Sequence, residues 1–211
     1  MPLDTEALKT VRSRSGAGVL DCKKALEETG GDIEKALVLL RERGLAEAVK
    51  KAGRETAEGL VHSYVHHDGR LGVMVELLCE TDFVARTEDF RELANELCMH
   101  IAMCAPRYLR AEDVPEAEAE EERRILRAQA EQEGKPEKVI EKMVEGRMRK
   151  FYAQVCLLQQ GWVRDEKVTI EELIKRTIAK VGENIRVSRF VRFQLGEEAQ
   201  MACAEQGGGE R

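Results

Sequence analysis

Aromatic residues are scarce in this chain: phenylalanine, tryptophan and tyrosine together account for 4% of its 211 residues. Proteins that bind single-stranded nucleic acid stack the bases on such rings, and a nucleic-acid footprint also requires a clustered basic surface. The formal net charge of −6 does not favour such a surface. The composition therefore argues against direct binding of RNA or DNA.

Long apolar runs are also missing. No run approaches the roughly 18 residues of a membrane span. The opening stretch MPLDTEALKTVRSRSG lacks the apolar middle of a secretory signal. The six cysteines include no C-x-x-C pair and fall mostly within apolar patterns, as reduced and buried thiols do. We expect a cytoplasmic protein.

Motifs for bond chemistry are absent too. The chain has neither a phosphate-binding glycine loop ending in Lys-Ser/Thr nor a G-x-S-x-G nucleophile elbow. His62 and His66 would lie about 13 Å apart along a strand, and His67 would point to the opposite face from His66. We therefore expect no enzyme activity, no metal site and no cofactor.

The first part of the chain has the periodicity of short helices. Helices are predicted over 4–13, 19–28 and 33–44, with Asp4 and Asp32 as N-caps. The pair Gly30-Gly31 is expected to end the second helix and Gly44 the third. A helical connector follows over 45–58. These features predict a three-helix domain with its connector over residues 1–54.

Residues 55–196 mix strand and helix patterns, which indicates the α+β class. Strands near 60–66 and 71–78 flank a predicted tight turn at Asp68-Gly69. Helices are predicted over 87–104 and from Thr169 through Val181, the latter starting with a Thr169–Glu172 capping box and ending at Gly182. A helical hairpin covers 116–152, and the polar tail 197–211 is expected to be disordered.

A last strand is predicted over 184–195. Strict alternation would place five apolar residues on one face: Ile185, Val187, Val191, Phe193 and Leu195. The other face would carry Arg186, Ser188, Phe190, Arg192 and Gln194. We expect this second, basic and partly aromatic face to meet solvent or a second subunit.

The stretch CETDFVARTEDF (79–90) admits two interpretations. Thr81 can cap a short turn from which Phe83 and Val84 fold back onto the core, and the residues alone favour this. Alternatively, Phe83 is an aromatic anchor displayed between a strand and a helix, with Asp82 beside it to compete for polar contacts in a partner.

Several segments resemble the elongation factor Ts family. Residues 11–61 resemble its N-terminal signature, and TDFVA (81–85) resembles its second signature. EGKPEKVIEKMVEGRMRKFYAQVCLLQQ (133–160) and IAKVGENIRVSRF (178–190) extend the likeness. The resemblance implies a ubiquitin-associated-like three-helix domain joined to a core with a three-stranded antiparallel sheet. It also implies an exchange factor that binds the GTPase elongation factor Tu and accelerates GDP release.

The resemblance also implies which residues meet the GTPase. Thr81, Asp82, Phe83 and Val84 match the loop that intrudes beside the magnesium site, with Phe83 wedging between helices of the nucleotide domain. Val181 and Gly182 match a second intruding loop, in which isoleucine is usual at the first position. Arg12, Val19, Leu20 and Lys23 match positions that dock on the GTPase, although Lys23 also fits a solvated helix face. Short members of the family pair as homodimers through the core sheet.

Two hypotheses from other classes are open on the sequence alone. An adaptor would use the three-helix domain to bind ubiquitin-like or nascent-chain partners, but it would not need TDFVA together with VGEN. An enzyme using Cys or His would predict metal content or a reactive thiol. Both a bacterial source and an organellar source with its transit peptide removed are compatible with the chain.

Overall fold

The computed structural model describes residues 5–134 and 136–197. The α-helices are α1 (Thr5–Ser15), α2 (Val19–Glu28), α3 (Ile33–Lys51), α4 (Asp82–Ala85), α5 (Glu88–Cys104), α6 (Glu116–Gln132), α7 (Glu137–Val155) and α8 (Ile170–Val181). The strands are β1 (Glu58–Val65), β2 (Leu71–Cys79), β3 (Gly161–Trp162), β4 (Asp165–Thr169) and β5 (Ile185–Gln194). Short 3-10 turns cover Ala111–Asp113 and Leu157–Gln159. This α+β arrangement confirms the predicted fold class.

Helices α1–α3 form what we call the N-terminal module. Its small apolar core is made of Val11, Cys22, Ala25, Leu26, Ala36 and Leu40. The predicted cap at Asp32 is present, because its carboxylate accepts a hydrogen bond from the Lys35 backbone N–H at 3.0 Å. Asp4 lies outside the described residues.

The prediction that Gly44 ends the third helix is wrong. Helix α3 continues through Gly44 to Lys51 and absorbs most of the expected connector. Glycine is needed at position 44 because the neighbouring helix leaves no space for a side chain. A Cβ on Gly44 would lie 2.9 Å from the Ala179 side chain of α8. Gly44 therefore permits close helix packing, and it carries no left-handed backbone angle.

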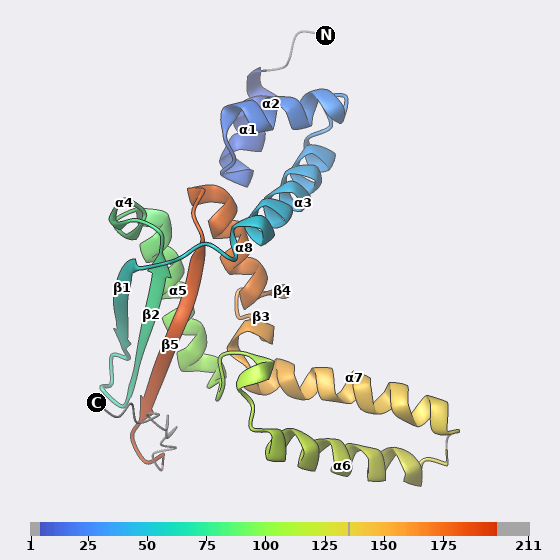
Figure 1. Ribbon diagram of the computed structural model, residues 1–211. Helices are drawn as coiled ribbons and strands as arrows, with labels where there is room; N and C mark the ends of the chain where they lie inside the picture. The colour runs from blue at the N-terminus through green and yellow to red at the C-terminus, as the bar shows by residue number, and fades with distance from the viewer. Residues whose placement is uncertain (1–4, 135, 198–211) are drawn as a thin grey trace, which may run out of the picture.

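The main sheet is antiparallel, with strand order β1-β2-β5. One face of it packs against α5, where Val73, Val75, Leu77 and Phe90 are fully buried. Figure 1 shows the sheet with α5 behind it. Of the predicted turn pair Asp68-Gly69, only Gly69 has a positive φ, 68°. The turn is also longer than two residues, because the His66 N–H donates to the Leu71 carbonyl and residues 67–70 lie between them.

Strand β5 does not alternate strictly, which corrects the predicted faces. Its register against β2 shifts between Glu76 and Leu77: Leu77 pairs with Val187 but Glu76 pairs with Arg189. The extra residue, Ser188, reverses the phase of everything after it. Phe190 therefore packs on the core, whereas Val191, Phe193 and Leu195 are exposed. The outward face is more apolar than predicted.

The helical hairpin α6–α7 projects away from the sheet, as Figure 1 shows. It is held by a small cluster of Ala130, Ile140, Val144 and Met148. A two-stranded sheet, β3-β4, follows it and was not predicted. Within the described ranges, no helix is long and apolar enough to cross a membrane.

Helix α8 links this core to the N-terminal module. Its N-cap Thr169 accepts a hydrogen bond from the Glu172 backbone N–H at 3.2 Å, which is half of the predicted capping box. The Glu172 carboxylate binds arginine side chains instead of returning to the cap. The helix ends as predicted at Gly182, whose φ is 84°. The N-terminal end of α8 therefore lies at the ion pair with Arg41 of α3, and its C-terminal end lies at the Gly182 turn before β5.

Candidate functional site

Helix α4 is a single turn at the end of β2, and it presents Phe83 to solvent. Thr81 caps it with a hydroxyl that accepts from the Val84 N–H at 3.5 Å. Val84 and Ala85 are buried beneath the turn, whereas the Phe83 side chain is 80% exposed. Asp82 forms a 2.8 Å ion pair with Arg86 on the turn's surface. We call residues 81–85 the 81–85 turn.

The favoured interpretation of this stretch is thus right for Val84 and wrong for Phe83. Helical residues are rotated by about 100° per position, so the four residues of a single turn cannot all face one core. Val84 and Ala85 occupy the buried positions. Phe83 is left as a large ring on a surface turn, which is the arrangement of an interface anchor.

Val181 and Gly182 lie at the end of α8, in what we call the 181–184 turn. The Gly182 N–H donates to the Ile178 carbonyl at 2.9 Å, which is an ordinary left-handed helix cap. Val181 is half-buried and packs against the main core. Both residues therefore have a structural role, and Gly182 also leaves the turn's surface without a side chain.

The structure brings the two turns together through Glu183. One carboxylate oxygen accepts from the Thr81 backbone N–H at 3.0 Å, and the other accepts from the Thr81 hydroxyl at 2.7 Å. In the reverse direction, the Asn184 N–H donates to the Glu80 carboxylate at 2.6 Å. Sequence reasoning missed Glu183, Asn184 and Glu80, and no local pattern signals them, because these hydrogen bonds join residues 102 and 104 positions apart. Figure 1 shows both turns at the same end of the sheet.

Cys79, the last residue of β2, has a thiol whose pKa is raised by burial. The Cys79 thiol donates to the Thr81 carbonyl at 3.1 Å. Burial, together with the negative charge of Glu183, raises the pKa of Cys79 to about 11. The thiol is therefore protonated at neutral pH and acts as a hydrogen-bond donor that supports the 81–85 turn.

The other predicted contact residues lie on the N-terminal module. Leu20 is 72% exposed at the start of α2, and Val19 beside it is also exposed. Arg12 and Lys23 are exposed on α1 and α2. The Lys23 Nζ atom lies 3.9 Å from the Glu27 carboxylate on the same helix, and both side chains are exposed to solvent. Figure 1 places this module beyond the end of the sheet that carries the two turns.

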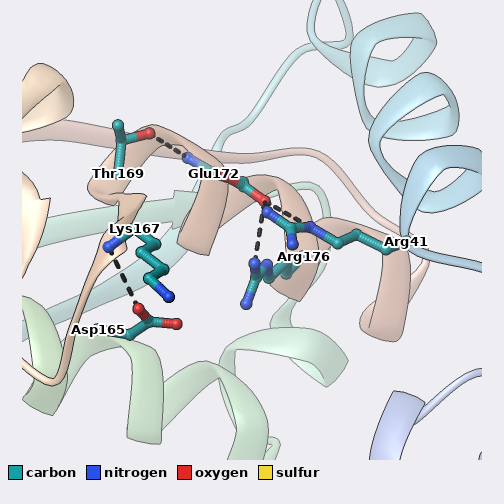
Figure 2. Close-up of polar contacts among 6 residues, drawn as sticks. All are labelled: Arg41, Asp165, Lys167, Thr169, Glu172 and Arg176. Carbon is teal, nitrogen blue, oxygen red and sulfur yellow. Dashed lines mark hydrogen bonds and ion pairs between the residues drawn. The ribbon is translucent and has the colours of Figure 1, made fainter. Parts of the chain in front are cut away.

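The module is attached to the core at what we call the α3–α8 joint. Arg41 donates from Nε to the Glu172 carboxylate at 2.8 Å, and Arg176 donates to the same oxygen at 3.0 Å. Figure 2 shows both guanidinium groups directed at Glu172, with Thr169 at the start of the helix. Burial disfavours the Glu172 charge, but the two arginines outweigh it and lower the pKa of Glu172 below its usual value.

No group of three or more His, Cys, Asp or Glu side chains within residues 5–134 and 136–197 is arranged to hold a metal ion. The features that stand out are instead an exposed ring on a fixed turn, a second turn bonded to it and a module with its own exposed leucine. They define the class of the protein as one that acts by binding a macromolecular partner.

Comparison with known proteins identifies the family. The family model described as Elongation factor TS matches residues 27–197. Elongation factor Ts of Fervidobacterium nodosum is 55% identical over 197 residues, which cover 93% of this chain and 100% of the relative. The protein of the same name from Thermoanaerobacter sp. is 53% identical over 203 residues, with 96% and 100% covered. That from Carboxydothermus hydrogenoformans is 54% identical over 195 residues, with 92% and 90% covered.

The chain therefore belongs to the elongation factor Ts family. It is a nucleotide exchange factor for elongation factor Tu and performs no bond chemistry of its own. This confirms the predicted function and decides against the adaptor and enzyme hypotheses. Both turns lie inside the segment that the family model matches, whereas Arg12, Val19, Leu20 and Lys23 precede it.

Proposed function

We propose that the 81–85 turn causes GDP release by entering elongation factor Tu beside its magnesium and phosphate site. In this proposal Phe83 wedges between helices of the nucleotide domain, and Asp82 competes there for polar contacts. Thr81 and Val84 hold the turn in shape from below. The observation that carries the proposal is the 80% exposure of the Phe83 ring on a turn anchored at both ends.

The physical consequence of such a wedge is loss of phosphate binding. Magnesium and the phosphate loop hold the terminal phosphates of a bound nucleotide, so displacing the helices that carry them weakens GDP binding. Coupling between two ligands is reciprocal. Whatever affinity GDP loses when the factor is bound, the factor loses when GDP is bound. The factor therefore binds the empty GTPase most tightly.

The remaining contact residues have supporting roles in this proposal. Val181 and Gly182 form a second contact next to the first, and the bare surface of Gly182 allows a partner backbone to approach closely. Arg12, Val19, Leu20 and Lys23 dock the N-terminal module on the GTPase. The exposed Leu20 is the natural anchor among these four.

The test is release of a fluorescent GDP analogue from elongation factor Tu in the presence of excess GDP. Wild type should accelerate release, and Phe83→Ala should lose about tenfold or more of that acceleration while keeping its fold by circular dichroism. Met103→Ala is the matched control, because Met103 is also a large exposed apolar residue, on α5. Equal rates for Phe83→Ala and wild type would refute the wedge.

We also propose that the chain is organised as two folding units, residues 1–54 and 55–196. The division is supported by an apolar cluster of residues 11–40 that is separate from the main core, to which α3 contributes Ala48. The tail expected to be disordered, 197–211, lies outside the described residues from 198 onward.

Finally, we propose that two copies pair through the outer face of the main sheet. Support comes from the large apolar residues exposed there: Val61, Val65, Met74, Val191 and Phe193. The Glu76–Arg189 pair, at 2.9 Å, lies at one end of this face. In a two-fold pair each copy offers the other the same surface, so both charges can find partners across it.

Sedimentation equilibrium at micromolar concentration tests the pairing. Wild type should sediment as a dimer and Phe193→Glu as a monomer, since a buried unpaired charge is costly. Val139→Glu is the control, because Val139 is an exposed residue of α7, and the α6–α7 hairpin projects away from the sheet. A monomeric wild type, or a dimeric Phe193→Glu variant, would refute the pairing.

A further inference from the structure

The 81–85 turn is too short to fix its own orientation. Helix α4 has four residues, and an isolated helix of that length is not stable, so its orientation depends on contacts with the rest of the fold. Val84 and Ala85 pack into the main core, and hydrogen bonds hold the two ends. At its C-terminal end the Thr87 hydroxyl donates to the Val84 carbonyl at 2.7 Å. At its N-terminal end the orientation of the turn depends on Thr81.

Thr81 is in turn held by Glu183, which is 102 residues away in the sequence. The Thr81 hydroxyl has two partners: it donates to Glu183 at 2.7 Å and accepts from the Val84 N–H of α4. The Thr81 N–H donates to the second Glu183 oxygen at 3.0 Å. Both carboxylate oxygens of Glu183 are thus engaged with one residue. We call this pair of hydrogen bonds the loop bridge.

The 181–184 turn that carries Glu183 is itself anchored. The Asn184 N–H donates to Glu80, and the Asn184 side-chain amide donates to the Ala52 and Arg54 carbonyls at 3.3 and 2.9 Å. The 81–85 turn therefore offers a backbone N–H to Glu183, and the 181–184 turn offers one to Glu80, the residue directly before the 81–85 turn. Such a crossed pair fixes both the distance and the relative rotation of the two segments, because hydrogen bonds to charged acceptors are short and directional.

We propose that Glu183 is a positioning residue for nucleotide release: it holds the 81–85 turn so that Phe83 is presented in one orientation, in register with Val181 and Gly182. This inference rests on the proposed role of Phe83. Glu183 acts through Thr81, with its oxygens already occupied, and not by touching nucleotide or magnesium. Its loss leaves the docking surface of the N-terminal module intact but lets the ring sample unproductive directions.

The test is a double-mutant cycle on Glu183→Ala and Phe83→Ala, read as GDP release from elongation factor Tu over a range of factor concentrations. Glu183→Ala should lower the maximal release rate about tenfold, as misplacement of a working group does, and should change the half-saturating concentration much less. In the Phe83→Ala background, Glu183→Ala should add little, because the side chain that it positions is already gone.

Two further variants keep the test informative if Glu183→Ala fails to fold. Glu183→Gln retains one carbonyl acceptor and should give an intermediate maximal rate. Thr81→Val removes the hydroxyl that bonds Glu183 but keeps the backbone N–H, so it should also give an intermediate maximal rate. Thermal unfolding of each variant shows whether the fold is kept.

The outcomes separate the two proposals. If Phe83→Ala loses the rate while Glu183→Ala and Glu183→Gln keep it, the positioning role is refuted and the wedge stands. If Glu183→Ala costs the same factor with and without Phe83, Glu183 acts independently and the positioning role is again refuted. If Phe83→Ala itself keeps the wild-type rate, both proposals fail.

Discussion

Phe83 and Leu20 are exposed to a similar degree, 80% and 72%, but they are held in very different ways. Phe83 lies on a four-residue helix that is fixed by hydrogen bonds to its peptide groups and cap. Leu20 lies on a ten-residue helix inside a module with its own small core. The position of that module relative to the core depends on helix packing and an ion-pair network at the α3–α8 joint, together with the Asn184 amide hydrogen bonds to the carbonyls just after α3.

The difference indicates a division of labour. Directional hydrogen bonds fix orientation, which matters for a side chain that must displace structural elements of a partner. Packing and a partly exposed ion pair fix position less strictly, which suffices for docking. We therefore expect changes near Phe83 to affect the maximal release rate, and changes in the module or the α3–α8 joint to affect the half-saturating concentration.

The largest effect on the docking side should come from Gly44→Ala. The new Cβ would lie 2.9 Å from the Ala179 side chain, so α3 must move away from α8 and carry the module with it. Overpacking of this kind costs ~1–3 kcal/mol. Docking on the GTPase requires the original position of the module and so restores part of this strain, and with ~1.4 kcal/mol per factor of ten we expect the half-saturating concentration to rise about tenfold with little change in maximal rate.

Gly146→Ala is the matched control for that experiment. Gly146 also lies within a helix, α7, but a Cβ there would meet nothing within 4 Å. Replacing an unconstrained helical glycine by alanine should stabilise the protein by up to ~1 kcal/mol and leave exchange unchanged. If Gly44→Ala behaves like Gly146→Ala in urea unfolding and in exchange, close packing at the α3–α8 joint does not position the module.

A smaller effect is expected for Leu20→Ala. Truncating a docking anchor removes binding that is common to all states of the complex, so it raises the half-saturating concentration without lowering the maximal rate. We expect a rise of about five- to tenfold. Ile125→Ala, which truncates an exposed residue of the hairpin, should have no effect. A fall in maximal rate for Leu20→Ala would break the proposed division between docking and release.

The fold was largely readable from the sequence because its elements carry strong local signals. The apolar stripe of α5 and the caps at Asp32 and Gly182 all predicted the observed structure. The predictions that were wrong depend on tertiary contacts. Gly44 indicates a helix end when read locally, but it is required by a neighbouring helix. Ser188 is an extra residue only relative to β2, so no pattern within β5 alone could reveal the reversal of its faces.

Less of the candidate site than of the fold could be predicted from the sequence. The residues alone favoured a buried Phe83 and left the exposed anchor as the alternative, which the resemblance to a family then favoured. The partners that hold the 81–85 turn could not be inferred either way. Glu183 and Thr81 are 102 residues apart, and their hydrogen bonds exist only because β2 and β5 are neighbours in the sheet.

The smallest effect should come from Glu172→Gln, which removes the charge that Arg41 and Arg176 share. Because the pKa of Glu172 is lowered in the folded protein, the ionised carboxylate stabilises the fold. This contribution is fully present above the unfolded value of about 4.3 and is lost as pH falls through the lower folded pKa. Arg41 is half-exposed, so solvent screening limits the loss at pH 7 to ~0.5–1 kcal/mol.

Urea unfolding from pH 7 down to about pH 3 measures this directly, with wild type and Glu172→Gln expected to converge at the acid end as the carboxylate is protonated. Glu171→Gln is the control, because Glu171 shares the first turn of α8 and its helix dipole but pairs with Lys175 on the same helix. Only Glu172 reaches α3. A stability difference that persists unchanged to pH 3, or that Glu171→Gln reproduces in full, would mean that the α3–α8 joint gains nothing from the charge and depends on helix packing.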